Sequence, residues 1–147
     1  MNLLGATNSI YCVDTDPAGT IVAAGGTEKQ LRLWDPRTQE KRMKLKGHKD
    51  NIRAVKIRLK MNFRFEVFLT SSEKYKYTIE KFSNDGRQCV SASSDGTVRL
   101  WSIGEQRVIR VFQISEQGIW TLAVDPNFRW VYAAGKQADI TGKNNYV

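Results

Sequence analysis

The sequence predicts an all-β protein in which a four-stranded unit is repeated about three times. The stretch "GTEKQLRLW" (26–34) has nearly the same pattern as "SSDGTVRLW" (93–101): a polar turn, alternating apolar residues, then Trp. Within the first unit, the alternating segments "SIYCV", "TIVAAG", "LRLW" and "KRMKLK" are separated by "DPAG", "GTEK" and "DPRTQE". Alternation bounded by turn residues is typical of half-buried strands.

The repeat has a period of 42 residues that is interrupted once. Ile10 and Ile52 open similar segments 42 residues apart, whereas Ile52 and Ile119 are 67 residues apart. The segments that follow Gly19 and Gly86 match in spacing, so the 25 additional residues lie between Ile52 and Gly86. A fixed period of this length indicates a repeat architecture with an insertion in the second unit.

A four-stranded unit of about 42 residues cannot bury both faces alone, so such units stack as the blades of a β-propeller. The competing fold, a β-sandwich, does not repeat Trp, turn and Gly at one register. We expect about three blades in an open arc, with units starting near Ile10, Ile52 and Ile119. The predicted organisation is blades over 1–56 and 83–136, an insertion over 57–81 and a divergent tail over 137–147, without a closing Trp strand. The unpaired blade edges of an open arc predict self-association.

Several function classes are disfavoured by what the sequence lacks. It has no apolar run that could span a bilayer, and "MNLLGATNSIYC" has no positive region typical of a signal peptide. Cys12 and Cys89 match no metal or redox spacing, which favours reduced thiols in a cytoplasmic or nuclear protein. The single histidine, His48, has no matching nucleophile, and no Gly-rich turn is suited to phosphate. We therefore expect a non-enzyme with no cofactor, metal or small-molecule substrate, and no membrane partner.

The motifs resemble the WD repeat. "LKGHKDNIRAV" (45–55) followed by "SNDGRQCVSASSDGTVRLWS" (83–102) contains a Gly-His pair, a Ser-x-Asp-Gly turn and a strand that ends in Trp. In that family a His, a strand Ser, the turn Asp and the Trp form a buried hydrogen-bond chain that locks the blade. The resemblance assigns this structural lock to four residues here: His48, Ser91, Asp95 and Trp101.

The other two units depart from this pattern. In the first, Gly5-Ala6 replaces Gly-His and Glu28 replaces the turn Asp. In the third, "EQG" replaces Gly-His and Gln137 replaces the turn Asp. We expect these two blades to lack the complete lock.

The resemblance extends to the WD repeat-containing protein 48 family, whose propellers bind and activate ubiquitin-specific proteases. It rests on three stretches and covers roughly residues 9–56 and 83–136: "GTEKQLRLWDPRTQEKRMKLKGHKDNIRAV", "DGRQCVSASSDGTVRLWSIGEQR" and "GIWTLAVDPNFRWVYAAGK". This implies a non-catalytic scaffold that stabilises a productive protease conformation. The alternative is a generic WD-repeat interaction scaffold, or a truncated fragment without independent activity.

The candidate partner-binding residues follow the opening Ile of each unit. Tyr11, Arg53 and Trp120 occupy equivalent positions, and aromatics and arginine are enriched at binding hot spots. Strand packing is the competing role for the two aromatics. The resemblance implies that Arg53, Trp120 and Lys136 lie on the protease-docking face, with Lys136 in the tight turn of the third unit.

The insertion "IRLKMNFRFEVFLTSSEKYKYTIEK" (57–81) alternates at period two and could form a hairpin. Its lysines and aromatics, and the net charge of +8, allow single-stranded nucleic-acid binding, which no further signature supports. It could instead bind a protein partner. The third hypothesis, which we favour, is a mis-spliced segment, because its Lys, Asn, Ile, Phe and Tyr have AT-rich codons. A transcript lacking the segment would support it.

Overall fold

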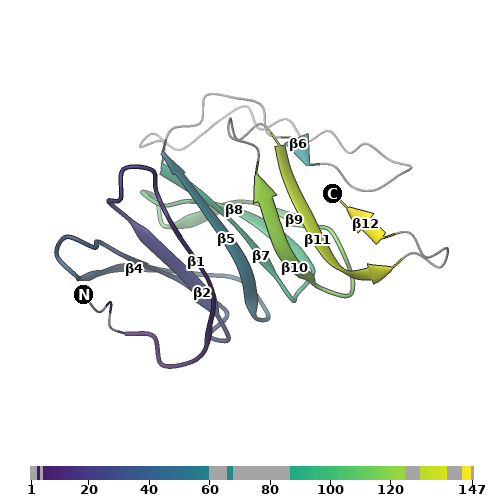
Figure 1. Cartoon of the computed structure of the whole chain (residues 1–147), viewed down its shortest axis with the longest axis horizontal. Coiled ribbons are helices and arrows are strands. Elements are labelled where there is room, and N and C mark those ends of the chain that lie inside the picture. Colours follow the sequence, from purple (N-terminus) through teal and green to yellow (C-terminus); the bar gives the residue numbers. More distant parts are fainter. Residues whose placement is uncertain are drawn as a thin grey trace.

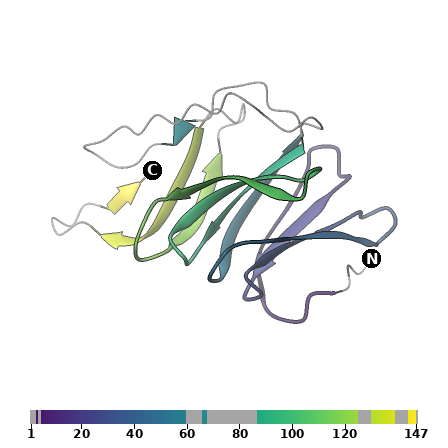
Figure 2. The ribbon, with the colours of Figure 1, turned by 180° about the vertical axis from the view of Figure 1, so that it is seen from behind.

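Three β-sheets lie side by side in the computed structural model, which describes residues 3, 5–59, 66–67, 87–124, 130–138 and 144–146. The middle sheet lies between the other two in both views (Figures 1 and 2). The strands are β1 (Ile10–Thr15), β2 (Val22–Gly26), β3 (Gln30–Trp34), β4 (Lys41–Lys46), β5 (Ile52–Leu59), β6 (Glu66–Val67), β7 (Arg87–Ser93), β8 (Thr97–Ser102), β9 (Arg107–Gln113), β10 (Ile119–Val124), β11 (Trp130–Ala138) and β12 (Asn144–Tyr146).

Each sheet corresponds to one repeat unit. Blade 1 has the strand order β1-β2-β3-β4 and blade 2 the order β5-β7-β8-β9, both fully antiparallel. Blade 3 has the order β10-β11-β12, and β6 pairs with β11 in parallel. The predicted all-β architecture of about three blades in an open arc is confirmed. Within the described residues, no helix is long and apolar enough to cross a membrane.

The apolar core lies between blades, as expected for sheets that cannot bury both faces alone. One cluster joins blades 1 and 2: Ile21, Ala23, Leu31, Leu33, Leu45, Ile52, Val55, Ile57, Cys89, Trp101 and Ile103. A second joins blades 2 and 3: Val90, Ala92, Val98, Leu100, Phe112, Ile119, Leu122, Val131 and Ala133. Blade 2 contributes to both clusters and is therefore covered on both faces.

Polar contacts also tie blade 1 to blade 2. The Asp14 carboxylate accepts a hydrogen bond from the Ile57 backbone N–H at 2.8 Å and lies 3.4 Å from the Lys56 ammonium. The two blades also pack tightly there, because a Cβ added at Gly25 would lie 2.6 Å from the Cγ2 atom of the Ile52 side chain. The first strands of neighbouring blades are thus held at a fixed separation.

The predicted insertion starts later than residue 57. Ile57 is buried in the core, and residues 57–59 continue β5 in antiparallel register with Cys89, Gln88 and Arg87. Burial of Ile57 and the ladder hydrogen bonds favour keeping this segment in the blade. Of the remaining predicted insertion, 60–65 and 68–81 lie outside the described residues, whereas Glu66–Val67 form β6, which pairs with β11.

The predicted tail contributes to blade 3. β11 continues to Ala138, and β12 pairs antiparallel with it. No pattern in the sequence predicted a strand after β11. The exposed edge of β11 offers unpaired N–H and C=O groups, and a segment with any extended backbone can satisfy them.

Candidate partner-binding site and blade lock

A β-bulge occurs at the same place in each blade. The pairing of the first strand with the second shifts between Ile10 and Cys12, between Ile52 and Ala54, and between Ile119 and Thr121. The additional residue at each bulge is Tyr11, Arg53 or Trp120. A bulge removes one residue from regular pairing and redirects its side chain.

Glycine permits the close approach at two of these bulges. Gly26 pairs with Ile10, and a Cβ on Gly26 would lie 2.0 Å from the Ser9 carbonyl oxygen. Gly135 pairs with Ile119, and a Cβ there would lie 2.1 Å from the Gly118 carbonyl oxygen. A larger residue at either position would force the bulge apart.

The three bulge side chains meet in one open hollow across the blades, lined by Tyr11, Arg53 and Trp120. Tyr11 is 45% exposed and Trp120 is 55% exposed. The Arg53 guanidinium carbon lies 4.5 Å from the centre of the Tyr11 ring, a cation–π contact. Arg53 Nε also donates a hydrogen bond to Ser94 Oγ at 3.0 Å, so the arginine is held from two sides.

Lys136 was expected in a tight turn, but its backbone lies within β11. The turn prediction was wrong because the pairing of Ala138 with Asn144 of β12 extends the strand past this residue. The contribution of Ser94 to the hollow was not predicted. A small polar turn residue gives no sequence signal that it will brace an arginine.

The four lock residues of blade 2 form a continuous hydrogen-bond chain. Trp101 Nε1 donates to Ser91 Oγ at 2.8 Å, and Ser91 Oγ lies 2.7 Å from His48 Nε2. His48 Nδ1 lies 2.9 Å from Asp95 Oδ2. An indole N–H can only donate and an ionised carboxylate can only accept. Neutral His48 therefore carries its proton on Nδ1 and accepts from the Ser91 hydroxyl.

Further donors hold Asp95 in place. Its carboxylate accepts hydrogen bonds from the Lys49 backbone N–H at 2.8 Å and from Thr97, whose N–H and hydroxyl lie at 2.9 and 2.6 Å. Burial opposes ionisation of Asp95, but the hydrogen bonds from Thr97, Lys49 and His48 outweigh it and lower its pKa to about 2. Burial also disfavours the charged imidazole and lowers the pKa of His48, against the opposing effect of Asp95. The lock thus joins a carboxylate to a neutral histidine.

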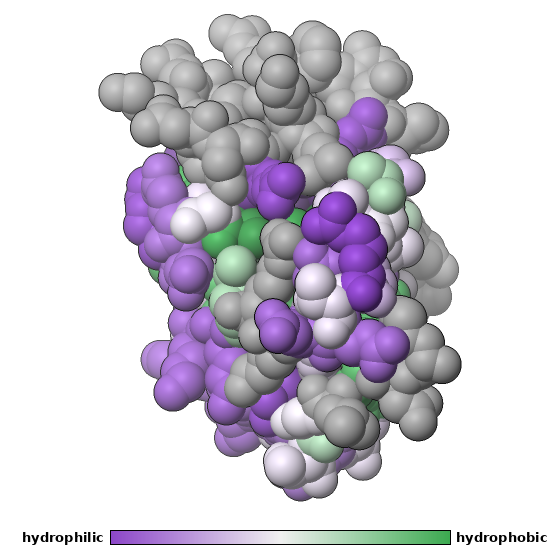
Figure 3. All heavy atoms as spheres, turned by 90° about the vertical axis from the view of Figure 1, so that its left-hand side faces the viewer, coloured by the Kyte–Doolittle hydropathy of each residue, from purple (hydrophilic) through white to green (hydrophobic). Residues whose placement is uncertain are grey.

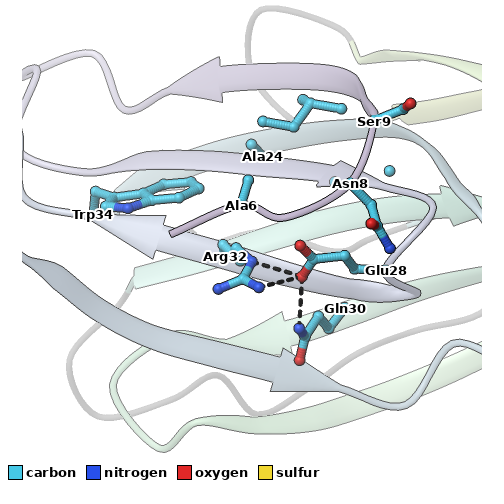
Figure 4. A pocket seen from close by; sticks show the side chains of 11 residues that line it. Ala6, Asn8, Ser9, Ala24, Glu28, Gln30, Arg32 and Trp34 are labelled. Atoms are coloured by element: carbon cyan, nitrogen blue, oxygen red, sulfur yellow. Dashed lines mark hydrogen bonds and ion pairs between the residues drawn. The ribbon is translucent and has the colours of Figure 1, made fainter. Parts of the chain in front are cut away.

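Blade 1 retains only part of this arrangement. Glu28 Oε1 accepts from the Thr7 backbone N–H at 2.7 Å, which matches the bond from Lys49 to Asp95 in blade 2. Glu28 Oε2 accepts from Gln30 Nε2 at 2.8 Å and from Arg32 Nε at 2.7 Å (Figure 4). Burial again opposes ionisation, but these hydrogen bonds lower the pKa of Glu28 to about 2.

A pocket takes the place of the histidine in blade 1. Ala6 and Ala24 stand at the positions of His48 and Ser91, and both line this pocket together with Trp34 (Figure 4). The sequence predicted the missing histidine and the changed turn acid. It did not predict that Arg32 and Gln30 would surround Glu28.

The comparison with protein families bears on these repeats. The family model described as "WD domain, G-beta repeat" matches residues 1–35 and 73–102. The second range contains Ser91, Asp95 and Trp101 of the lock. The chain therefore contains WD repeats in these two ranges. WD repeats typically mediate protein–protein interaction, and the match supports a general interaction-scaffold role for this chain.

Blade 3 departs furthest from the lock. The position of His48 is taken by Ser115 and not, as predicted, by a residue of "EQG" (116–118), because the 67-residue offset between the blades gives 115. The Ser115 hydroxyl accepts a hydrogen bond from the Gln117 backbone N–H at 3.0 Å. Ala133 replaces Ser91 and is buried in the core between blades 2 and 3.

Among the described residues, no group of His, Cys, Asp or Glu side chains could hold a metal ion.

Proposed function

We propose that this WD-repeat protein docks a ubiquitin-specific protease on the hollow lined by Tyr11, Arg53 and Trp120, and stabilises its productive conformation. One observation carries the choice of surface: equivalent bulges in three consecutive blades direct one side chain each into a common hollow. The resemblance of the blades to the WD repeat-containing protein 48 family supports the choice of partner.

The chemistry of the hollow suits a protein partner. Tyr11 and Trp120 supply exposed aromatic area, and Arg53 supplies a fixed cation that a carboxylate can engage. Because Ser94 and Tyr11 already restrain Arg53, little side-chain freedom is lost on binding. Lys136 is proposed to add a further positive charge to this surface.

The test is direct binding of the full chain to purified ubiquitin-specific protease catalytic domains, with ubiquitin release measured in parallel. Trp120→Ala and Arg53→Glu should each weaken binding by about thirtyfold or more, as expected for hot-spot residues. Lys136→Ala should weaken it less. Val111→Ala is the control, since Val111 is exposed on β9 and does not line the hollow.

The outcomes separate the two candidate functions. Protease binding that is lost in the Trp120 and Arg53 variants, with unchanged circular dichroism, supports the proposal. If no ubiquitin-specific protease binds but another protein is captured through the same two residues, the chain is a generic scaffold. If the chain instead binds nucleic acid, the affinity should fall steeply as the salt concentration rises and should not be changed by Trp120→Ala.

A further inference from the structure

Equivalent apolar positions differ sharply in burial between the first blade and the other two. The first strands of blades 2 and 3 each bury two such residues against the preceding blade: Ile52 and Val55 in β5, Ile119 and Leu122 in β10. The same positions in β1 are Ile10 and Val13, which are 51% and 65% exposed. A third position follows this trend, since Val22 is half-buried whereas Cys89 and Val131 are fully buried.

The outer face of blade 1 therefore has the composition of an inter-blade interface, and none of the described strands covers it. Figure 3, which views the molecule from the blade 1 side, shows apolar atoms at the surface between hydrophilic ones. Exposed β-branched and aliphatic side chains at interface positions are typical of surfaces that associate. The same surface packs against the preceding blade in both blade 2 and blade 3.

The opposite end of the arc carries the complementary surface. Tyr132 in β11 is 44% exposed, while its neighbours Val131 and Ala133 face blade 2. The equivalent residues in the earlier blades are Ala23 and Val90, which are fully buried against the next blade. Tyr132 thus stands where a following blade would pack.

We propose that two copies of this chain associate head to tail, with the Tyr132 face of each copy against the Ile10 and Val13 face of the other. The contact repeats the one that already joins blade 1 to blade 2 and blade 2 to blade 3. Two copies of three blades give six, within the four to eight blades that close a propeller. A head-to-tail contact that closes forms a ring and leaves neither face exposed.

The test is sedimentation of the full chain over a range of concentrations. The wild type should form a dimer. Val13→Arg and Tyr132→Arg should each weaken the dimer by at least about tenfold, because an arginine would be buried without a partner. Val111→Arg introduces the same side chain at an exposed apolar position away from both faces, and should leave the dimer unchanged.

Mixing the two variants provides a second measurement. The Val13→Arg chain keeps its Tyr132 face and the Tyr132→Arg chain keeps its Val13 face, so the mixture should regain one interface and form a heterodimer. A variant that had failed to fold could not do this. A monomeric wild type overturns the proposal. Loss of the dimer with Val13→Arg but not with Tyr132→Arg also overturns it, because the contact would then be head to head.

Discussion

Blades 1 and 2 are built on the same strand plan but stabilise their loops differently. In both, a turn carboxylate accepts a hydrogen bond from a backbone N–H of the segment before the first strand: Thr7 to Glu28, and Lys49 to Asp95. Only blade 2 continues this contact through His48 and Ser91 to a buried tryptophan. The carboxylate alone is therefore sufficient to anchor the loop, and the histidine chain adds a connection to the core.

The difference extends to the way in which each carboxylate is neutralised. Glu28 is paired with the Arg32 guanidinium, whereas Asp95 lies 2.9 Å from a histidine and 3.9 Å from Arg99. The longer glutamate side chain approaches its arginine more closely than the aspartate does. Loss of the histidine in blade 1 is thus accompanied by a closer ion pair and by hydrogen bonds from Arg32 and Gln30 to Glu28.

The largest expected effect comes from making blade 2 resemble blade 1. His48→Ala should destabilise the full chain by about 2–4 kcal/mol, because it leaves a cavity and removes partners from Ser91 and Asp95. Urea unfolding measures the loss. The double variant His48→Ala, Ser91→Ala should cost less than the sum of the single variants, since the two residues share one hydrogen bond. If the losses in unfolding free energy were additive, the hydrogen-bond chain would not act as one energetic unit.

A second comparison concerns a core position rather than the lock. Gln88 in blade 2 is buried, and its side-chain amide has no hydrogen-bond partner among the described residues, whereas blade 1 has Ile21 there. Gln88→Leu should stabilise the chain by about 1–3 kcal/mol by removing an unsatisfied polar group. The control is Gln113→Leu, which breaks a 2.9 Å bond to the Ser115 carbonyl and should not stabilise.

A smaller gain is expected from building the complete lock into blade 1. The triple variant Ala6→His, Ala24→Ser, Glu28→Asp should stabilise the chain by about 1 kcal/mol, the usual net value of one hydrogen bond. Ala6→His alone should give no gain, because Ala24 offers the imidazole no hydroxyl. Thermal unfolding compares the two. Equal stabilities would show that blade 1 lacks the geometry for the lock and that Arg32 is the better partner.

The smallest effect is a pH dependence that differs between the blades. The pKa of His48 is lowered in the fold, so its contribution is present above its ordinary pKa of 6.5 and is lost as pH falls below that value. Asp95 and Glu28, with pKa values of about 2, lose theirs only as pH falls from about 4.5 towards 2. Unfolding midpoints between pH 7 and 5 should fall for the wild type and stay level for His48→Gln. A parallel fall in both would assign the effect to another group.

The sequence allowed the fold class to be predicted because the repeat is local and periodic. The opening isoleucines mark the starts of β1, β5 and β10. The spacing of Ser91, Asp95 and Trp101 reflects fixed positions on two adjacent strands and in the turn between them. The roles proposed for the hollow remain predictions, although Tyr11, Arg53 and Trp120 do lie together.

What could not be predicted depends on contacts between distant segments. The pairing of β12 with β11, and hence the strand position of Lys136, depends on an edge that only the assembled sheet presents. The late start of the insertion depends on the burial of Ile57 against blade 1. The Arg32 partner of Glu28 depends on side-chain length, which a motif with one substituted position does not reveal.

The bulges at Tyr11, Arg53 and Trp120 have a consequence for how this surface can change over time. Because each bulge residue is outside the regular ladder, its side chain can be exchanged without altering strand register or the inter-blade core. The three positions can therefore vary within a constant framework, with Tyr11 and Arg53 coupled to each other by their cation–π contact. A repeat protein of this kind can acquire a new binding preference by substitutions at three positions. The residues that form its strands and its inter-blade core are left unchanged.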